Sequence, residues 1–160
     1  MKVQELVNLI NAETDELLDT DEDHIPYINH ALDVLAYTLA GTYAPDLLRS
    51  IDVHDGDDVP TDFASLVPPN GYPLGIIGQT FHTQDGGDVT GVKYQAMWPH
   101  ISKLDDDLPC KDLYANALLL TAAYLIKKKT YIPVEYCAQD KEFTTQVMNA
   151  ISGMRGGSSG

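Results

Sequence analysis

The sequence has few basic residues, few cysteines and no long hydrophobic run, and each shortage argues against a class of protein. Ten lysines and arginines stand against 24 aspartates and glutamates, which gives a formal net charge of -14. Such a charge repels nucleic-acid phosphates and anionic lipids, so we expect neither a sequence-specific DNA reader nor a membrane protein. No apolar run approaches the roughly 18 residues that span a bilayer. The amino end MKVQELVNLI lacks the basic-then-apolar order of a signal peptide, so we expect synthesis in a cytoplasm.

Motifs of catalysis and cofactor binding are also missing. Cys110 and Cys137 belong to no Cys-x-x-Cys or Cys/His cluster, and we interpret both as reduced core thiols. The five histidines have no paired metal-ligand spacing, and neither a phosphate-binding loop nor a dinucleotide-binding glycine pattern occurs. We therefore expect a protein that is not an enzyme and that carries no cofactor and no metal.

Hydrophobic periodicity predicts helices near both ends of the chain. A short amphipathic helix is expected over residues 2–11, with an apolar face made of Val3, Leu6, Val7 and Ile10. A second is expected to follow Asp23 as its N-cap, with Pro26 in its first turn and Gly41 at its end. Its apolar seam is expected at Ile25, Ile28, Leu32, Leu35 and Leu39. A last helix is expected from about Glu135 to Ser152.

The longest predicted helix runs from Asp107 to Lys129 and should form the centre of the core. Its apolar and small side chains fall on more than one face, which is typical of a helix surrounded by protein. One stripe contains Leu113, Ala117, Leu120 and Tyr124, and the stripe beside it contains Leu118, Ala122, Leu125 and Ile126. The run Asp105-Asp106-Asp107 is expected to cap its start. Three lysines, Lys127 to Lys129, stand at its end, where cations complement the helix dipole. Contact with an acidic partner is the alternative explanation for these lysines.

The segment between residues 50 and 98 changes character, with many glycines and prolines and little helical periodicity. Asp-Gly and Asn-Gly pairs, typical of tight hairpin turns, separate short β-prone pieces. These pieces are Ile51–Val53, Phe63–Val67, Leu74–Ile77 and Gly91–Met97. We therefore predict a mainly α fold: one small helical-bundle domain over residues 1–152 with a β-hairpin insertion at about 50–98, followed by a flexible glycine-rich tail at 153–160. The alternative for the tail is that it is partly a cloning remnant.

The run from Asp52 to Asp58 is the most suggestive chemical cluster, because hard cations bind several carboxylate oxygens from one loop. It does not fit a calcium-binding EF-hand loop: with Gly56 at the sixth position, Ile51 takes the first and Asp62 the twelfth. We favour a solvated hairpin tip. A small metal-dependent hydrolase using Asp55, Asp57, Asp58 or Asp105 to Asp107 remains an alternative.

Two short patterns and the order of the predicted elements resemble one known family. The second predicted helix contains Tyr27-Ile28-Asn29, followed by Ala31 and Leu32, and the insertion contains Val59-Pro60-x-Asp62-Phe63. Over most of residues 2–152 the chain resembles the head–tail connector, or adaptor, proteins of tailed double-stranded DNA bacteriophages. The matched residues are packing and turn residues and include no catalytic group.

The resemblance implies a homo-oligomeric ring, commonly of twelve subunits, in the neck of the virion. Such a ring would bind the portal protein and a tail or second neck protein, and DNA would pass through it during ejection without specific binding. We expect subunit contacts, portal contacts or channel lining at Asp55, Asp57, Asp58, Asp85, Asp88, Tyr27, Met154 and Arg155. A tail-completion or terminator ring of the virion is the alternative within the same class.

Overall fold

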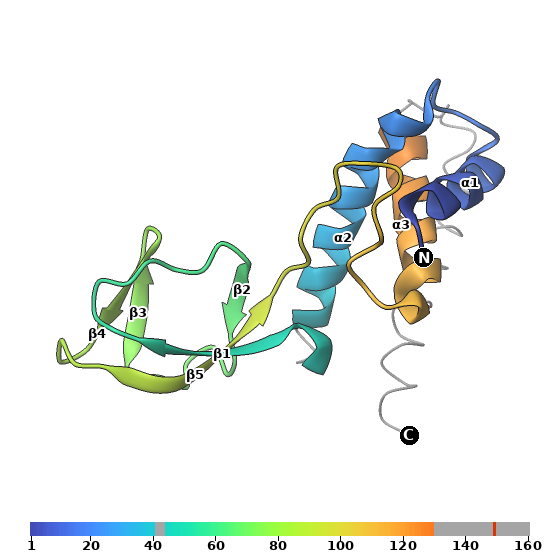
Figure 1. The fold of residues 1–160 in the computed structure, drawn as a ribbon. Helices are drawn as coiled ribbons and strands as arrows, with labels where there is room; N and C mark the ends of the chain where they lie inside the picture. The colour runs from blue at the N-terminus through green and yellow to red at the C-terminus, as the bar shows by residue number, and fades with distance from the viewer. Residues whose placement is uncertain (41–43, 130–148, 150–160) are drawn as a thin grey trace. The chain divides into compact units, whose positions relative to one another are not determined.

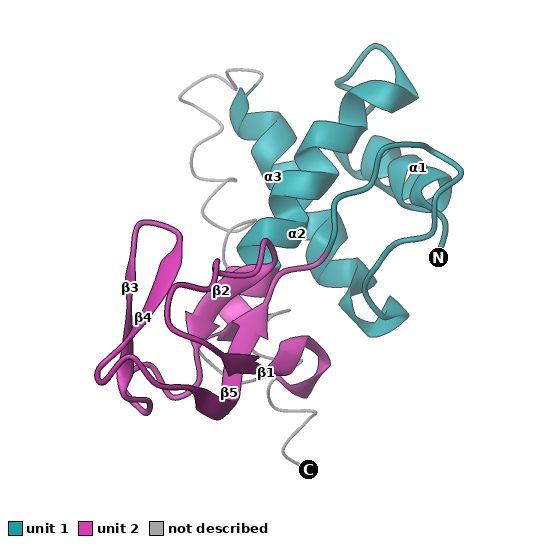
Figure 2. Cartoon of the chain, turned by 60° about the vertical axis from the view of Figure 1, so that its left-hand side comes forward, with its two compact units in different colours: residues 1–35, 99–160 teal, residues 36–98 magenta. Residues whose placement is uncertain are grey.

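A computed structural model describes residues 1–40, 44–129 and 149 of the chain. The chain is divided into two compact units, one made of residues 1–35 and 99–160 and the other of residues 36–98 (Figure 2). We refer to them as the helical unit and the β unit. All five strands that the structure describes lie in the β unit.

The prediction of a mainly α fold is wrong, because the strands form two antiparallel sheets and the fold is α+β (Figure 1). A hairpin insertion would be an appendage of the helices, whereas these sheets enclose an apolar cluster of their own. The helices are α1 (Val3–Thr14), α2 (Ile25–Ala40) and α3 (Ala115–Lys129). The strands are β1 (Leu48–Val53), β2 (Phe63–Leu66), β3 (Leu74–Ile77), β4 (Thr80–Thr83) and β5 (Val89–Ala96).

Helices α1 and α3 pack together in the helical unit, and each buries apolar side chains that the sequence predicts to be buried. The predicted apolar stripe of α1, which is Val3, Leu6, Val7 and Ile10, is fully buried. In α3, Leu118, Ala122 and Ile126 are fully buried as well. Figures 1 and 2 show α2 beside α3, running in the opposite direction. The spacing predicts a seam on α2 made of Ile25, Ile28, Leu32, Leu35 and Leu39. All of these except Ile25 are buried, and Ile25 is only partly buried.

Helix α3 begins later than predicted, because Asp105 to Asp107 stabilise a loop instead of capping a helix. The Asp106 carboxylate accepts hydrogen bonds from the backbone N–H groups of Ser102 (3.0 Å) and Lys103 (2.9 Å). These hydrogen bonds hold the pKa of Asp106 below its usual value. A 3₁₀ turn at Asp112–Tyr114 precedes the helix. Leu113, predicted to lie on the buried stripe, is therefore in that turn and is 59% exposed.

The loop after residue 98 is attached to α2 by Asn29, one of the residues that carry the family resemblance. The Asn29 side chain donates to the Ile101 carbonyl (3.0 Å) and accepts from the Ile101 N–H (2.8 Å). One turn further along the helix, Asp33 lies 2.9 Å from His100. Asp23, predicted to cap α2, instead accepts a hydrogen bond from the backbone N–H of Thr20 at 3.2 Å.

In the β unit, strand β5 is central and has β1 on one side and β2 on the other, both antiparallel to it. Strands β3 and β4 form a separate two-stranded sheet. Val53, Phe81 and Val92 are buried together in the core. Because these three come from β1, β4 and β5, the core joins both sheets.

Strand β4 was not predicted, although its Phe81 is the largest fully buried side chain of the described chain. The β3–β4 hairpin turns at Gly78, which has a φ of 64°, and Gln79. The predicted turn at Asn70-Gly71 joins no paired strands, because β2 and β3 belong to different sheets. The predicted helix at residues 135–152, the helix end at Gly41, Cys137 and the tail at 153–160 lie outside the described residues. Cys110 is buried, and burial raises the pKa of its thiol to about 11.

Replacing Leu118 with alanine tests the central position of α3. Leu118 is fully buried, so the substitution should lower the free energy of unfolding by about 2–5 kcal/mol through lost burial and a residual cavity. The exposed Leu113→Ala is the matched control and should change the free energy by no more than about 0.5 kcal/mol. Urea unfolding followed by circular dichroism measures both. Equal effects would contradict the packing described.

Candidate functional site

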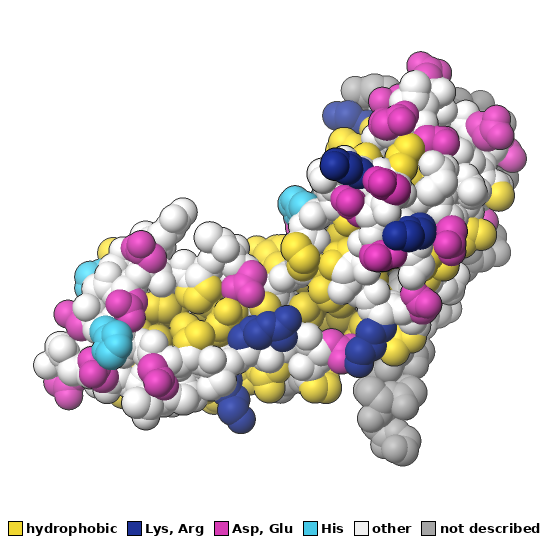
Figure 3. Space-filling view, in the orientation of Figure 1, with side chains coloured by type: hydrophobic (Ala, Val, Ile, Leu, Met, Phe, Trp, Pro, Cys, Tyr) yellow, Lys and Arg dark blue, Asp and Glu magenta, His cyan; other side chains and the backbone are white. Residues whose placement is uncertain are grey.

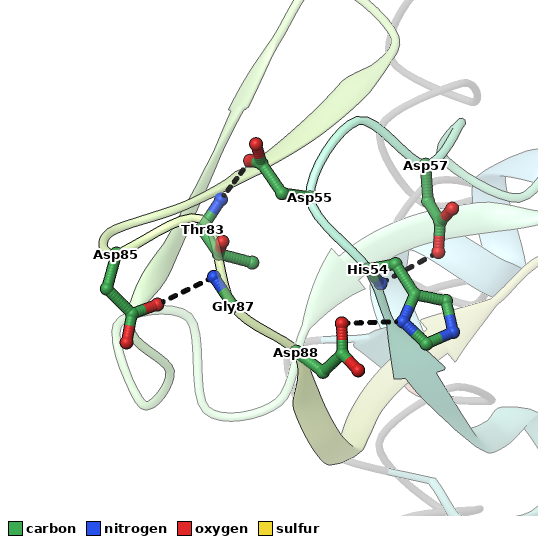
Figure 4. Close-up of polar contacts among 7 residues, drawn as sticks. All are labelled: His54, Asp55, Asp57, Thr83, Asp85, Gly87 and Asp88. Carbon is green, nitrogen blue, oxygen red and sulfur yellow. Dashed lines mark hydrogen bonds and ion pairs between the residues drawn. The ribbon is translucent and has the colours of Figure 1, made fainter.

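Two acidic loops of the β unit come together, and we call them the aspartate loops. They are residues 54–58, which follow β1, and residues 84–88, which precede β5 (Figure 4). His54 Nδ1 lies 2.7 Å from an Asp88 oxygen and joins one loop directly to the other. Asp55 accepts a hydrogen bond from the backbone N–H of Thr83 at 2.8 Å, which attaches the first loop to the end of β4.

Two further carboxylates of these loops, Asp57 and Asp85, accept hydrogen bonds from the backbone of their own turns. Asp57 accepts from the His54 N–H (2.8 Å), and Asp85 accepts from the Gly87 N–H (2.9 Å). Each turn contains one glycine in the left-handed region, Gly56 at φ 90° and Gly86 at φ 73°. Backbone hydrogen bonds thus orient the carboxylates of Asp55, Asp57 and Asp85 on the surface.

His54 is the only basic side chain within the two loops. Its hydrogen bond to Asp88, with the charge of Asp88 and then that of Asp57 and Asp52, raises the pKa of the imidazole above its ordinary value of 6.5. Both His54 and Asp88 are well exposed, so solvent screens the pair. Protonated His54 offsets part of the negative charge between the loops.

The predicted site residues fall into different places. The structure brings Asp55, Asp57, Asp85 and Asp88 together, and the backbone of Asp58 pairs with Thr80 beside them. Tyr27 belongs to the helical unit. Met154 and Arg155 lie outside the described residues.

The described residues provide no metal-binding group of three or more His, Cys, Asp or Glu side chains. Asp55, Asp57 and Asp85 each accept a backbone hydrogen bond, so one oxygen of each is already occupied. Asp105, Asp106 and Asp107 lie in the other unit, where Asp107 pairs with Lys2 at 3.1 Å. Among the described residues there is therefore no ligand set for the metal-dependent hydrolase considered above.

The charge of the β unit is strongly one-sided. Residues 36–98 contain eight aspartates and no glutamate, with Arg49 and Lys93 as their only basic residues besides histidine. Figure 3 shows acidic side chains spread over the visible face of this unit and few basic ones. A surface of this kind repels phosphates out to about one Debye length, roughly 8–10 Å at physiological salt.

A groove in the helical unit was not predicted. It has a volume of about 630 Å³ and lies where the start of α2 meets the end of α3. Its walls combine Tyr27 and Leu125 with Lys128 and Lys129. The lysine run was the one sequence signal that could have indicated it, through the alternative of an acidic partner.

The second pattern behind the family resemblance has a structural role in the β unit. Asp62 accepts a hydrogen bond from the Tyr94 hydroxyl (2.9 Å), and burial and this bond raise the pKa of Tyr94 to about 12. Phe63 stacks on Tyr94 and meets Phe81 edge-on, with ring centroids 5.6 and 6.2 Å apart. These contacts join the start of β2 to β5.

Comparison with known proteins adds no assignment. No protein-family model matches the sequence, and no curated protein is significantly similar to it. Within the described part of the chain, none of the helices combines the length and apolarity needed to cross a membrane.

Replacing Asp88 with asparagine tests the link between the aspartate loops. The substitution removes the largest cause of the raised His54 pKa, so this pKa should fall toward 6.5. In the wild type, stability from the pair is fully present below the unfolded-state pKa of histidine and is lost as the pH rises through the raised pKa of His54. Asp88→Asn should weaken that dependence. An NMR titration of His54 measures the shift, with Asp85→Asn as the control that leaves it unchanged.

Proposed function

We propose that this protein is a structural head–tail connector of a tailed bacteriophage, forming a ring between portal and tail through which DNA leaves the head. The observation that carries the proposal is the pair of aspartate loops, in which Asp55, Asp57 and Asp85 accept backbone hydrogen bonds on a compact β unit. The two short sequence patterns that carry the family resemblance support the same role.

Fixed carboxylates suit a surface past which DNA must slide. A wall of lysines and arginines would bind phosphates, release counterions and hold the DNA in place. Aspartates keep DNA away from the wall by repulsion at short range. Because Asp55, Asp57 and Asp85 are each hydrogen-bonded to the backbone, they cannot easily swing aside to accommodate a phosphate.

The β unit also offers contacts suited to assembly. Strands β1 and β2 are the edges of the three-stranded sheet, and an edge strand can pair with a strand of a neighbouring chain. At the end of β3, Ile77 is 70% exposed and Ile76 is 38% exposed. Burial of these side chains against a neighbour or the portal would remove apolar surface from water.

Deleting the protein from the phage that encodes it tests the role. Particles lacking it should be filled or leaky heads without attached tails, as seen by negative-stain microscopy, and supplying the protein in trans should restore tails. Normally tailed particles would contradict the proposal. A label on the protein then separates a connector at the portal from a terminator ring placed within the tail.

Reversing charge in the aspartate loops tests the passage of DNA. Asp58→Lys combined with Asp88→Lys should leave tails attached, yet reduce infectivity by roughly tenfold or more, because lysines in every subunit would bind phosphates. Glu5→Lys combined with Asp105→Lys makes the same charge change on exposed sites of the helical unit. Equal loss of infectivity in both variants would show that the aspartate loops have no special role.

A further inference from the structure

The groove between α2 and α3 has an apolar floor and a basic rim. Pro26, Tyr27 and Leu125 supply the apolar side chains, and Lys128 and Lys129 stand exposed at the rim. His30, also exposed, lines the same groove. Such a site suits a segment that carries an apolar side chain flanked by carboxylates.

Charge complementarity makes this groove unusual on an acidic chain. The sequence has 24 acidic residues against ten lysines and arginines, and a run of three lysines ends α3. Within the described part of the chain, no ion pair joins Lys128 or Lys129 to a carboxylate. The positive rim would therefore attract an acidic segment, and this protein is itself rich in such segments.

The turn after α1 has the complementary character. It reads Asp15-Glu16-Leu17-Leu18-Asp19, and its Leu17 is 42% exposed between carboxylates. Two successive residues that are not glycine, Asp15 (φ 53°) and Glu16 (φ 57°), adopt the left-handed conformation. Such a conformation is costly for side-chain-bearing residues, and it is held here by hydrogen bonds from both N–H groups to the Asn11 carbonyl.

We propose that the turn at residues 15–19 of one copy docks into the groove of a second copy, with Leu17 against Tyr27 and Leu125 and with Glu16 and Asp19 facing Lys128 and Lys129. The turn does not line the groove of its own chain, so the contact joins two copies. Because turn and groove are different surfaces, the contact is head-to-tail and can be repeated around a ring.

This contact deepens the proposed function and rests on it in one respect, since a ring requires a repeated head-to-tail contact. The connector role and the turn-to-groove contact can fail separately. If deletion of the protein gives tailless particles but no turn-to-groove contact is found, the connector role stands and only the contact is excluded.

Disulfide trapping between copies tests the contact in the full chain. One preparation carries Leu17→Cys and the other His30→Cys, both with Cys110→Ala and Cys137→Ser, so that a disulfide can form only between copies. Mild oxidation of the mixture should give at least fivefold more mixed dimer than Leu17→Cys paired with Leu113→Cys. Leu113 is an exposed leucine of the same helical unit. Circular dichroism checks that every variant is folded.

Exchanging the charges of the groove and the turn is the second part of the experiment. Lys128→Glu with Lys129→Glu, added to the His30→Cys chain, should reduce the mixed dimer to the Leu113→Cys level. Adding Glu16→Lys with Asp19→Lys to the Leu17→Cys chain should then restore it. The proposal would be overturned if Leu17→Cys formed as much mixed dimer with Leu113→Cys as with His30→Cys, or if the charge changes left the amount of mixed dimer unchanged. The same results are expected if residues 130–160 of the same chain occupy the groove.

Discussion

The hydrogen bond from a backbone N–H to an aspartate carboxylate is the interaction on which the loops of both units depend. It closes the turn after β1 through Asp57, the turn before β5 through Asp85 and the loop before α3 through Asp106. In each case the carboxylate satisfies backbone groups that no helix or sheet reaches. The acidity of this chain is therefore partly structural. The same side chains that hold the loops also place fixed negative charge on the surface.

The parts of the fold that were predictable are those with a repeated apolar spacing. The buried faces of α1 and α2 follow directly from Leu6, Ile10, Leu32 and Leu35. Strand β3 has the bounds that its apolar run indicated. Local pattern was sufficient wherever one face of an element packs on the core.

The wrong and missing predictions have a different cause, because the decisive contacts follow no repeated apolar spacing. Strand β4 has only four residues, and Phe81 is buried by Val53 and Val92, which no local pattern connects. The expected start of α3 was wrong because Asp106 binds the backbone of Ser102 and Lys103 and does not cap the helix. The prediction of a mainly α fold was wrong because the sequence does not show the core that joins the two sheets. At the candidate site, the acidic turns were predictable, but the His54–Asp88 pair and the groove depend on tertiary contacts.

The two patterns behind the family resemblance now have physical explanations. Asn29 forms hydrogen bonds with the backbone of Ile101 and so holds the loop after residue 98 against α2. Asp62 and Phe63 both contact Tyr94 of β5. The proposed function depends on the surfaces of the protein. Measuring the mass of the protein mixed with a phage portal, and imaging the complex, tests the proposal most directly. The account predicts a closed ring of copies around the channel with the aspartate loops facing the DNA path, and single copies bound away from the channel would contradict it.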